Sequence, residues 1–124
     1  MSVLVESDIL IEVSRGRDRD LVSRWLDLAS SNLAVLYSPV SAAELWAGAR
    51  PPEHDALRGL FHALRCLPID EESGRQAGDY LRLYRKSHGV ELADALIAAT
   101  AVTHKASLWT RNRKHYPMKD LIFF

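Results

Sequence analysis

Cysteine is nearly absent from this chain of 124 residues, and no hydrophobic run is long. The lone Cys66 cannot form an intrachain disulfide, which suits a reducing compartment, and we expect it to be a small core residue. The most apolar stretch, residues 92–102, is interrupted by Asp94 and is shorter than the about 20 apolar residues of a membrane span. The N-terminus has no basic segment before its apolar residues and is a poor secretory signal. We therefore expect a cytoplasmic protein with no membrane span.

An excess of charge of either sign is also missing. Lysine and arginine number 16, as do aspartate and glutamate, so bulk charge does not favour nucleic acid as a partner and local patches would have to bind it. Hydrophobic residues make up 48% and charged residues 26%, which are ordinary values for a globular protein. This length and composition predict one domain over residues 1–124.

Several well-known catalytic motifs are absent. The five histidines show no HExxH or comparable ligand spacing, and there is no cysteine pair, which argues against a zinc site. The chain also has no glycine-rich phosphate loop, dinucleotide-binding fingerprint or nucleophile elbow. Carboxylate and amide oxygens are left as ligands, and these favour a hard cation such as Mg²⁺ or Mn²⁺.

Hydrophobic patterning predicts alternating strands and helices. The continuous apolar run at residues 3–5 is typical of a strand buried on both faces. We expect further strands at 33–37, 66–69, 107–109 and 121–124, and helices at about 7–14, 21–29, 41–49, 53–64, 70–87 and 91–104. This alternation predicts an α/β fold with a mostly parallel sheet covered on both faces.

The first strand ends at Glu6, where an α/β sheet places its ligands. Asp8 follows within two residues and has two readings of equal weight, as a site residue or as the cap of the first helix, a role that Ser7 shares. Asp94 is the strongest single signal, because its helical neighbours are apolar and an unpaired buried carboxylate is costly. The alternative for Asp94 is stabilisation by the helix N-terminus. Glu91 is a candidate of the same region, although a solvated first-turn glutamate is more common.

Two further candidates have ordinary structural explanations. Ser41 and Glu44 have the spacing of a capping box, which would open a helix at Ser41 and, taken alone, is the better explanation of Glu44. Asn112, with Thr110, follows the strand at 107–109 and is either a site residue or part of a turn.

Basic residues cluster in two short segments. The one dense basic run consists of Arg111, Arg113, Lys114 and His115, and it fits phosphate binding or a solvated loop. Arg15 and Arg17 form the second, smaller basic segment.

Taken together, four sequence segments that contain these candidate residues resemble the PIN-domain ribonucleases, and most closely the VapC-type toxins of toxin–antitoxin pairs. The resemblance covers nearly the whole chain. Its anchors are Glu6-Ser7-Asp8-Ile9-Leu10-Ile11, Ser41-x-x-Glu44-Leu45 with Gly48, Asp94-Ala95-Leu96-Ile97-Ala98-Ala99, and Thr110-Arg111-Asn112 before Tyr116.

The resemblance implies a three-layer α/β/α sandwich, a homodimer, and RNA hydrolysis at an acidic site that holds Mg²⁺ or Mn²⁺. It assigns the metal site to Glu6, Glu44 and Asp94, with Asn112 at a fourth position. From their own positions beside these residues, Asp8, Glu91 and Thr110 are candidates for support, and Arg15, Arg17, Arg111, Arg113 and Lys114 are the candidates for RNA contact. The resemblance also implies a small VapB-like antitoxin whose C-terminal segment enters the active-site groove.

One departure concerns Glu6, because the family normally has aspartate at this position. The extra methylene moves the carboxylate from the geometry that octahedral Mg²⁺ demands. Glu6 is either a natural variant or a substitution that tames a toxic nuclease. The alternative function is accordingly an inactive PIN-fold module that binds antitoxin or RNA.

Overall fold

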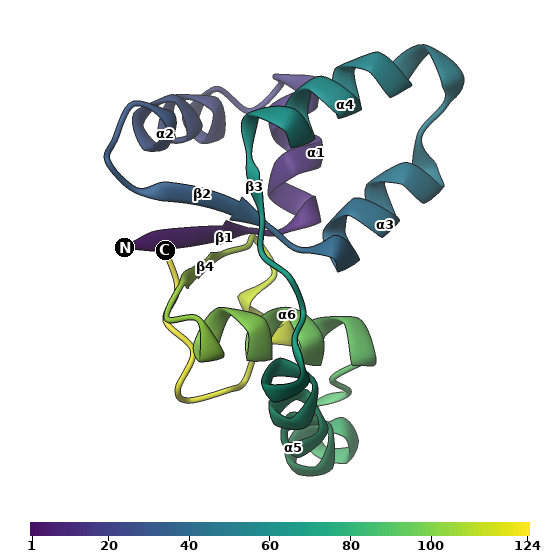
Figure 1. The fold of residues 1–124 in the computed structure, drawn as a ribbon, viewed down its shortest axis with the longest axis vertical. Coiled ribbons are helices and arrows are strands. Elements are labelled where there is room, and N and C mark those ends of the chain that lie inside the picture. The colour runs from purple at the N-terminus through teal and green to yellow at the C-terminus, as the bar shows by residue number, and fades with distance from the viewer.

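The computed structural model describes residues 1–124, which are arranged around a four-stranded parallel sheet (Figure 1). The strands are β1 (Ser2–Val5), β2 (Ala34–Tyr37), β3 (Arg65–Cys66) and β4 (Ser107–Trp109). Their order in the sheet is β3-β2-β1-β4, and every neighbouring pair is parallel. The predicted α/β fold with a parallel sheet is therefore confirmed.

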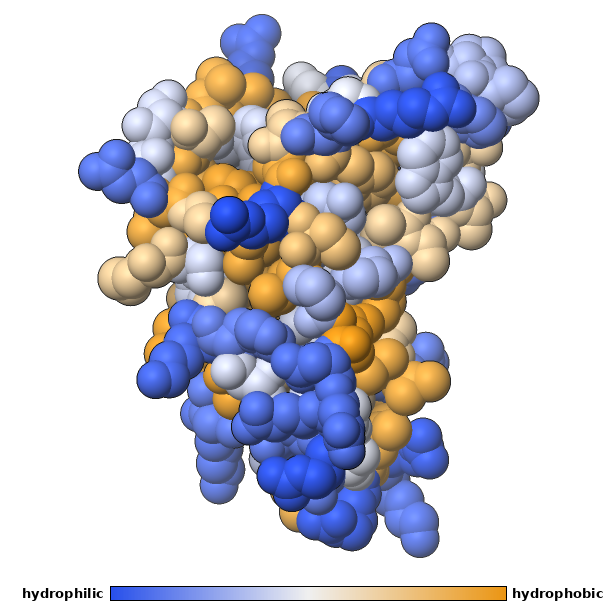
Figure 2. Space-filling model, viewed as in Figure 1, coloured by the Kyte–Doolittle hydropathy of each residue, from blue (hydrophilic) through white to orange (hydrophobic).

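Helices cover both faces of this sheet. They are α1 (Ser7–Arg15), α2 (Arg19–Ala29), α3 (Pro39–Gly48), α4 (His54–Ala63), α5 (Glu71–His88) and α6 (Leu92–Thr103), with short 3-10 helices η1 (Pro51–Glu53) and η2 (Arg113–His115). Figure 1 shows α1 to α4 on one side of the sheet and α5 with α6 on the other. The surface of the α5 end is largely hydrophilic (Figure 2). No helix combines the length and hydropathy needed to cross a membrane.

Two hydrophobic cores lie on the two faces, and β1 contributes to both. Val3 and Val5 pack with the α1 to α4 side, whereas Leu4 packs with α5 and α6. This alternation follows from the two-residue period of a strand. It explains why β1 reads as a continuous apolar run, since neither of its faces meets water.

The start of α3 differs from the prediction. The helix begins at Pro39, and the Ser38 hydroxyl accepts a hydrogen bond from the backbone N–H of Val40 at 3.1 Å. Proline is favoured in the first turn because its missing N–H has no helical partner there. Ser41 therefore lies inside the helix, and the predicted capping box with Glu44 is wrong. Glu44 is consequently available for other contacts.

The α1 start also differs, because Glu6 occupies the position before the helix and makes no side-chain cap there. Neither Ser7 nor Asp8 is the capping residue. Both lie in the first turn.

The sheet edges depart from the prediction as well. Strand β3 is confined to Arg65–Cys66, at the edge of the sheet, so Cys66 is exposed and the expectation of a core cysteine is wrong. Residues 121–124 form no full strand but pair with β4 through one bridge, between Leu108 and Phe123. The backbone N–H of Leu108 donates to the carbonyl of Ile122 at 2.8 Å.

Candidate active site

The carboxyl edge of the sheet brings the two ends of the chain together. Strands β1 and β4 are parallel neighbours, so Glu6 and Thr110, which follow them, leave the sheet at the same edge. The backbone N–H of Glu6 donates to the carbonyl of Trp109 at 3.1 Å. Polar side chains after parallel strands are the usual binding groups of an open α/β sheet.

An open cavity of about 390 Å³ lies at this edge. It gathers four of the predicted site residues from distant segments: Glu6, Glu44, Asp94 and Asn112. Asp8 and Glu91 also line it, and the remaining lining residues are Ser7, Ile11, His88, Gly89, Ala93 and His115. Thr110 does not line the cavity but bonds to two of its carboxylates.

Glu6 is the most strongly perturbed carboxylate of the cavity. Burial raises the pKa of Glu6 to about 7, and the negative charges of Asp8 and Glu44 act in the same direction. The Thr110 hydroxyl opposes this shift, because it donates to Glu6 Oε2 at 2.7 Å and stabilises the charged form. Glu6 therefore carries a charge that the folded chain only partly compensates.

Tyr116 completes the surroundings of Glu6. Its hydroxyl is buried and makes no hydrogen bond of good geometry. Burial, together with the nearby charge of Glu6, raises the pKa of Tyr116 well above its ordinary value. The phenol therefore remains protonated and is a potential donor to Glu6.

Asp8 is held by both ends of the chain. Its Oδ1 accepts the backbone N–H of Ile9 at 2.8 Å, and its Oδ2 accepts that of Arg111 at 2.7 Å. The side-chain amide of Asn112 and the Thr110 hydroxyl also donate to Oδ2, each at 3.3 Å. These donors compensate the Asp8 charge locally.

Asp94 and Glu44 have few partners by comparison. Asp94 Oδ2 accepts only the backbone N–H of Glu91, at 3.4 Å, and burial raises the pKa of Asp94. Glu44 is exposed, and its Oε1 accepts the Ser7 hydroxyl at 3.2 Å. Glu91 is exposed and precedes α6. Asp94 thus makes one long bond at the N-terminus of α6 and also lines the cavity.

The cavity fits a hard cation by donor chemistry, since carboxylate and amide oxygens are the ligands that Mg²⁺ and Mn²⁺ prefer. The poor solvation of Glu6, whose pKa burial raises to about 7, is a second point of agreement, because a cation would stabilise the ionised carboxylate. The fit is not complete, because no three Asp, Glu, His or Cys side chains are placed to hold one ion together.

The five basic candidates all lie outside this cavity. Arg111 approaches Glu12 at 3.8 Å and Asp18 at 3.9 Å. Arg15 lies 3.8 Å from Glu12. Arg113 donates to the carbonyl of Phe124 at 3.3 Å. All five residues are exposed. Of these, Arg15, Arg111 and Arg113 are engaged with the protein itself.

Four residues of the site neighbourhood were not among the predicted site residues: Ser7, His88, His115 and Tyr116. Ser7 was interpreted only as a helix cap. Nothing in the sequence near His88 indicates a site, and Tyr116 served only to mark the end of the Thr110-Arg111-Asn112 anchor. His115 belongs to the basic run, which was the one available signal.

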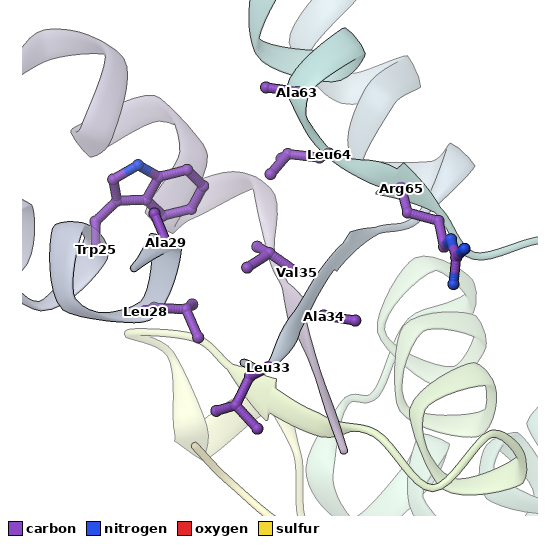
Figure 3. Close-up of a pocket in the computed structure, with 9 residues that line it drawn as sticks. All are labelled: Trp25, Leu28, Ala29, Leu33, Ala34, Val35, Ala63, Leu64 and Arg65. Atoms are coloured by element: carbon purple, nitrogen blue, oxygen red, sulfur yellow. The ribbon is translucent and has the colours of Figure 1, made fainter. Parts of the chain in front are cut away.

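Two other hollows are lined by few or no acidic side chains. A hollow of about 470 Å³ between α2, β2 and the end of α4 is lined by apolar side chains and Arg65, which points away from them (Figure 3). A groove of about 640 Å³ between α1, α3 and α4 is half apolar and shares Glu44 with the acidic cavity.

Fold and site together define an α/β protein with acidic side chains converging at the carboxyl edge of a parallel sheet. The PIN domain family matches residues 3–121, and the chain belongs to that family. The resemblance seen in the sequence is therefore confirmed.

Known proteins agree with this assignment. The chain is 41% identical to Ribonuclease VapC10 of Mycobacterium tuberculosis over 119 residues, which cover 94% of this chain and 86% of the relative. It is thus a homologue of the VapC ribonucleases. Its fold matches VapBC-1 from nontypeable Haemophilus influenzae with a TM-score of 0.83 at 23% identity, over 100% of this chain and 97% of that one. A toxin–antitoxin complex from Klebsiella pneumoniae matches with a TM-score of 0.76 at 22% identity, over 98% and 96%.

Proposed function

We propose that this chain is a metal-dependent endoribonuclease toxin that hydrolyses RNA phosphodiester bonds. The observation that carries the proposal is the cavity that gathers Glu6, Glu44, Asp94 and Asn112 from four separate segments of a PIN-domain chain. The homology to a VapC ribonuclease supports the same activity.

Glu6, Glu44 and Asp94 would hold Mg²⁺ or Mn²⁺, with Asn112 as a fourth, neutral ligand. A cation bound there would acidify a water molecule and neutralise charge on the scissile phosphate. The chain contributes placement: the Thr110 hydroxyl orients Glu6, and the Ser7 hydroxyl bonds to Glu44. Burial of Glu6 keeps its carboxylate poorly solvated, which favours a cationic partner over water.

Glu6 in place of aspartate would attenuate this activity. The Glu6 carboxylate accepts a hydrogen bond from the Thr110 hydroxyl at 2.7 Å, and Thr110 directly follows β4. The Glu6 side chain is therefore already oriented by this donor. Changing the reach of the carboxylate alters the ligand geometry that Mg²⁺ requires. Glu6→Asp should therefore increase cleavage.

The test is cleavage of a transfer-RNA pool in Mg²⁺, Mn²⁺ or EDTA by this chain and by Glu6→Asp. Asp94→Asn, purified in the same way, controls for contaminating nuclease. Cleavage that requires metal and is absent from Asp94→Asn supports the proposal, whereas retained metal-dependent cleavage in Asp94→Asn rejects the assigned site.

A binding module without activity is the second candidate. It is favoured by the absence of three carboxylates placed around one ion and by Glu6 itself. Under this alternative the chain binds antitoxin or RNA but does not cut. Cleavage restored by Glu6→Asp alone would support it for the chain as it stands.

We further propose a VapB-like antitoxin partner and a homodimer. The half-apolar groove between α1, α3 and α4 leads to Glu44 and would receive an antitoxin segment on its way to the acidic cavity. Co-purification with the product of the neighbouring reading frame, followed by light scattering of the complex, tests both. A monomer that captures no such product contradicts them.

RNA contact is proposed for Arg15, Arg17, Arg111, Arg113 and Lys114. Arg17 and Lys114 are exposed. Alanine at either position should weaken RNA binding and reduce its salt dependence by about one counterion. Fluorescence anisotropy over a series of salt concentrations measures both quantities.

A further inference from the structure

The Asp8 carboxylate joins the two ends of the chain at the acidic cavity. Its Oδ1 accepts the Ile9 N–H at 2.8 Å, while its Oδ2 accepts the Arg111 N–H at 2.7 Å and the Asn112 side-chain amide at 3.3 Å. Both oxygens thus have close donors. Three charge-assisted bonds to the chain fix the position of this carboxylate, which favours a structural role over direct chemistry.

The loop that Asp8 holds also controls Glu6. The Thr110 hydroxyl has a single proton, and its shorter bond, 2.7 Å, goes to Glu6 Oε2 rather than to Asp8 Oδ2 at 3.3 Å. The same hydroxyl accepts the backbone N–H of Asn112 at 3.0 Å. Movement of residues 110–112 would therefore move the donor that orients Glu6.

Asp8 fixes which way the Asn112 amide faces. Only Nδ2 can donate to a carboxylate, so Nδ2 must face Asp8, and an amide oxygen there would be repelled. No group of the chain donates to the other amide atom, Oδ1, and Asn112 lines the cavity. The amide oxygen is consequently the atom of Asn112 left for a ligand.

We propose that Asp8 is a positioning residue, matched to a neutral amide at position 112, and that it holds the 110–112 loop so that Thr110 orients Glu6. A carboxylate at position 112 would place a second negative charge about 3.3 Å from Asp8 Oδ2, where like charges repel strongly. Asn112 is thus required by Asp8 in this chain. The inference rests on the proposed function only for its consequence on RNA cleavage.

A charge-swap cycle tests the pairing in metal-free protein. Asn112→Asp should lower Tm by about 5–10 °C near neutral pH. The double variant Asp8→Asn with Asn112→Asp should regain at least half of that loss, because the amide and the carboxylate have exchanged places. Asp70→Asn is the matched control, since Asp70 also accepts a backbone N–H at a helix start, from Ser73 at 2.8 Å, but lies outside the cavity. Asp70→Asn combined with Asn112→Asp should give no such recovery.

Amide hydrogen exchange reports on the loop directly. The Arg111 N–H should exchange about tenfold faster or more in Asp8→Ala than in the unmodified chain, and Asp8→Asn, which keeps an acceptor oxygen, should restore part of the protection. RNA cleavage should fall in Asn112→Asp and recover in the charge swap. Changes in Tm that simply add in the double variant, or an Arg111 amide that exchanges alike in all variants, would overturn the proposal. Recovery of Tm in a protein series that never cuts RNA would instead reject the proposed ribonuclease activity and leave the pairing standing.

Discussion

Asp8 and Asp94 are the same residue type in the first turns of two helices, and they line the same cavity, yet their surroundings differ. Asp8 has three hydrogen-bond donors at 2.7–3.3 Å, from Ile9, Arg111 and Asn112. Asp94 has one donor, at 3.4 Å. The comparison teaches that a position at the start of a helix does not decide whether a carboxylate serves structure or chemistry. The role of the carboxylate depends instead on the groups that face it.

The physical reason lies in what each helix start meets. The start of α1 faces the 110–112 loop, and Asp8 accepts the backbone N–H of Arg111, which has no strand partner. The start of α6 faces the cavity, where Asp94 is half-buried and burial raises its pKa. On the proposed function, Asp8 therefore stabilises the fold, while Asp94 is the carboxylate left available to a cation.

The largest expected effect is the loss of RNA cleavage when Asp94 is substituted. Asp94→Asn should reduce metal-dependent RNA cleavage by more than about 100-fold, because loss of a direct ligand exceeds the 10–100-fold cost of losing its supporting groups. Tm should be unchanged or slightly higher, since the variant removes a poorly compensated charge. Initial rates and a thermal melt on the same preparation measure both. A large fall in Tm would indicate that Asp94 supports the fold instead.

For stability the order should be reversed, with the larger loss on substitution of Asp8 than on substitution of Asp94. Asp8→Ala should lower the free energy of unfolding by about 3 kcal/mol, since it removes charge-assisted bonds to two backbone amides. Asp94→Ala should lower it by less than about 1 kcal/mol, because only one long bond is lost. Urea titration of the two variants compares them directly. Equal losses would remove the distinction between the two carboxylates.

The titration of Glu6 should make the stability of the fold depend on pH. The pKa of Glu6 is about 7 in the fold against 4.5 for an unperturbed glutamate, so the folded state binds this proton more tightly than the unfolded chain does. The resulting stability is complete below about pH 4.5 and is lost as pH rises through about 7. Allowing for solvent screening, the loss is on the order of 2 kcal/mol. It should be seen in metal-free protein by denaturation at several pH values.

Glu6→Gln provides the control for this pH dependence. The neutral side chain has no proton to lose, so the decline in stability between about pH 4.5 and 7 should be reduced by a similar amount. An unchanged pH profile in Glu6→Gln would mean that another group causes the decline.

The smallest effect is expected at Ser7. Its hydroxyl donates to Glu44 Oε1 at 3.2 Å, which is a long bond to an exposed partner. Ser7→Ala should lower cleavage by about 2–10-fold and stability by about 1 kcal/mol or less. Ser14→Ala, which removes a hydroxyl bonded only to the carbonyl of Ile11, is the matched control and should leave cleavage unchanged. Equal rates for both variants would show that Glu44 needs no support from Ser7.

Most of the fold was predictable because its elements have strong local patterns. The apolar run at β1 and the helical spacing of α5 and α6 were correctly interpreted. The errors fall where tertiary context decides: Pro39 moves the start of α3, and residues 121–124 pair with β4 through a single bridge.

The site was partly predictable for the same reason. The gathering of Glu6 and Thr110 follows from parallel strands that end at one edge. The role of Asp8 depends on donors about 100 positions away in the chain, which no local pattern reveals. Tyr116 likewise reaches Glu6 only through the fold.

Manganese binding tests the central distinction most directly. Titration of Mn²⁺, followed by electron paramagnetic resonance, should be carried out on the unmodified chain, Asp94→Asn and Asp8→Asn. We expect Asp94→Asn to lose the bound ion, whereas Asp8→Asn should still bind it, about 10–100-fold more weakly at most. Loss of the ion in Asp8→Asn together with full binding in Asp94→Asn would contradict the account, because Asp8 would then be the ligand and Asp94 the structural group.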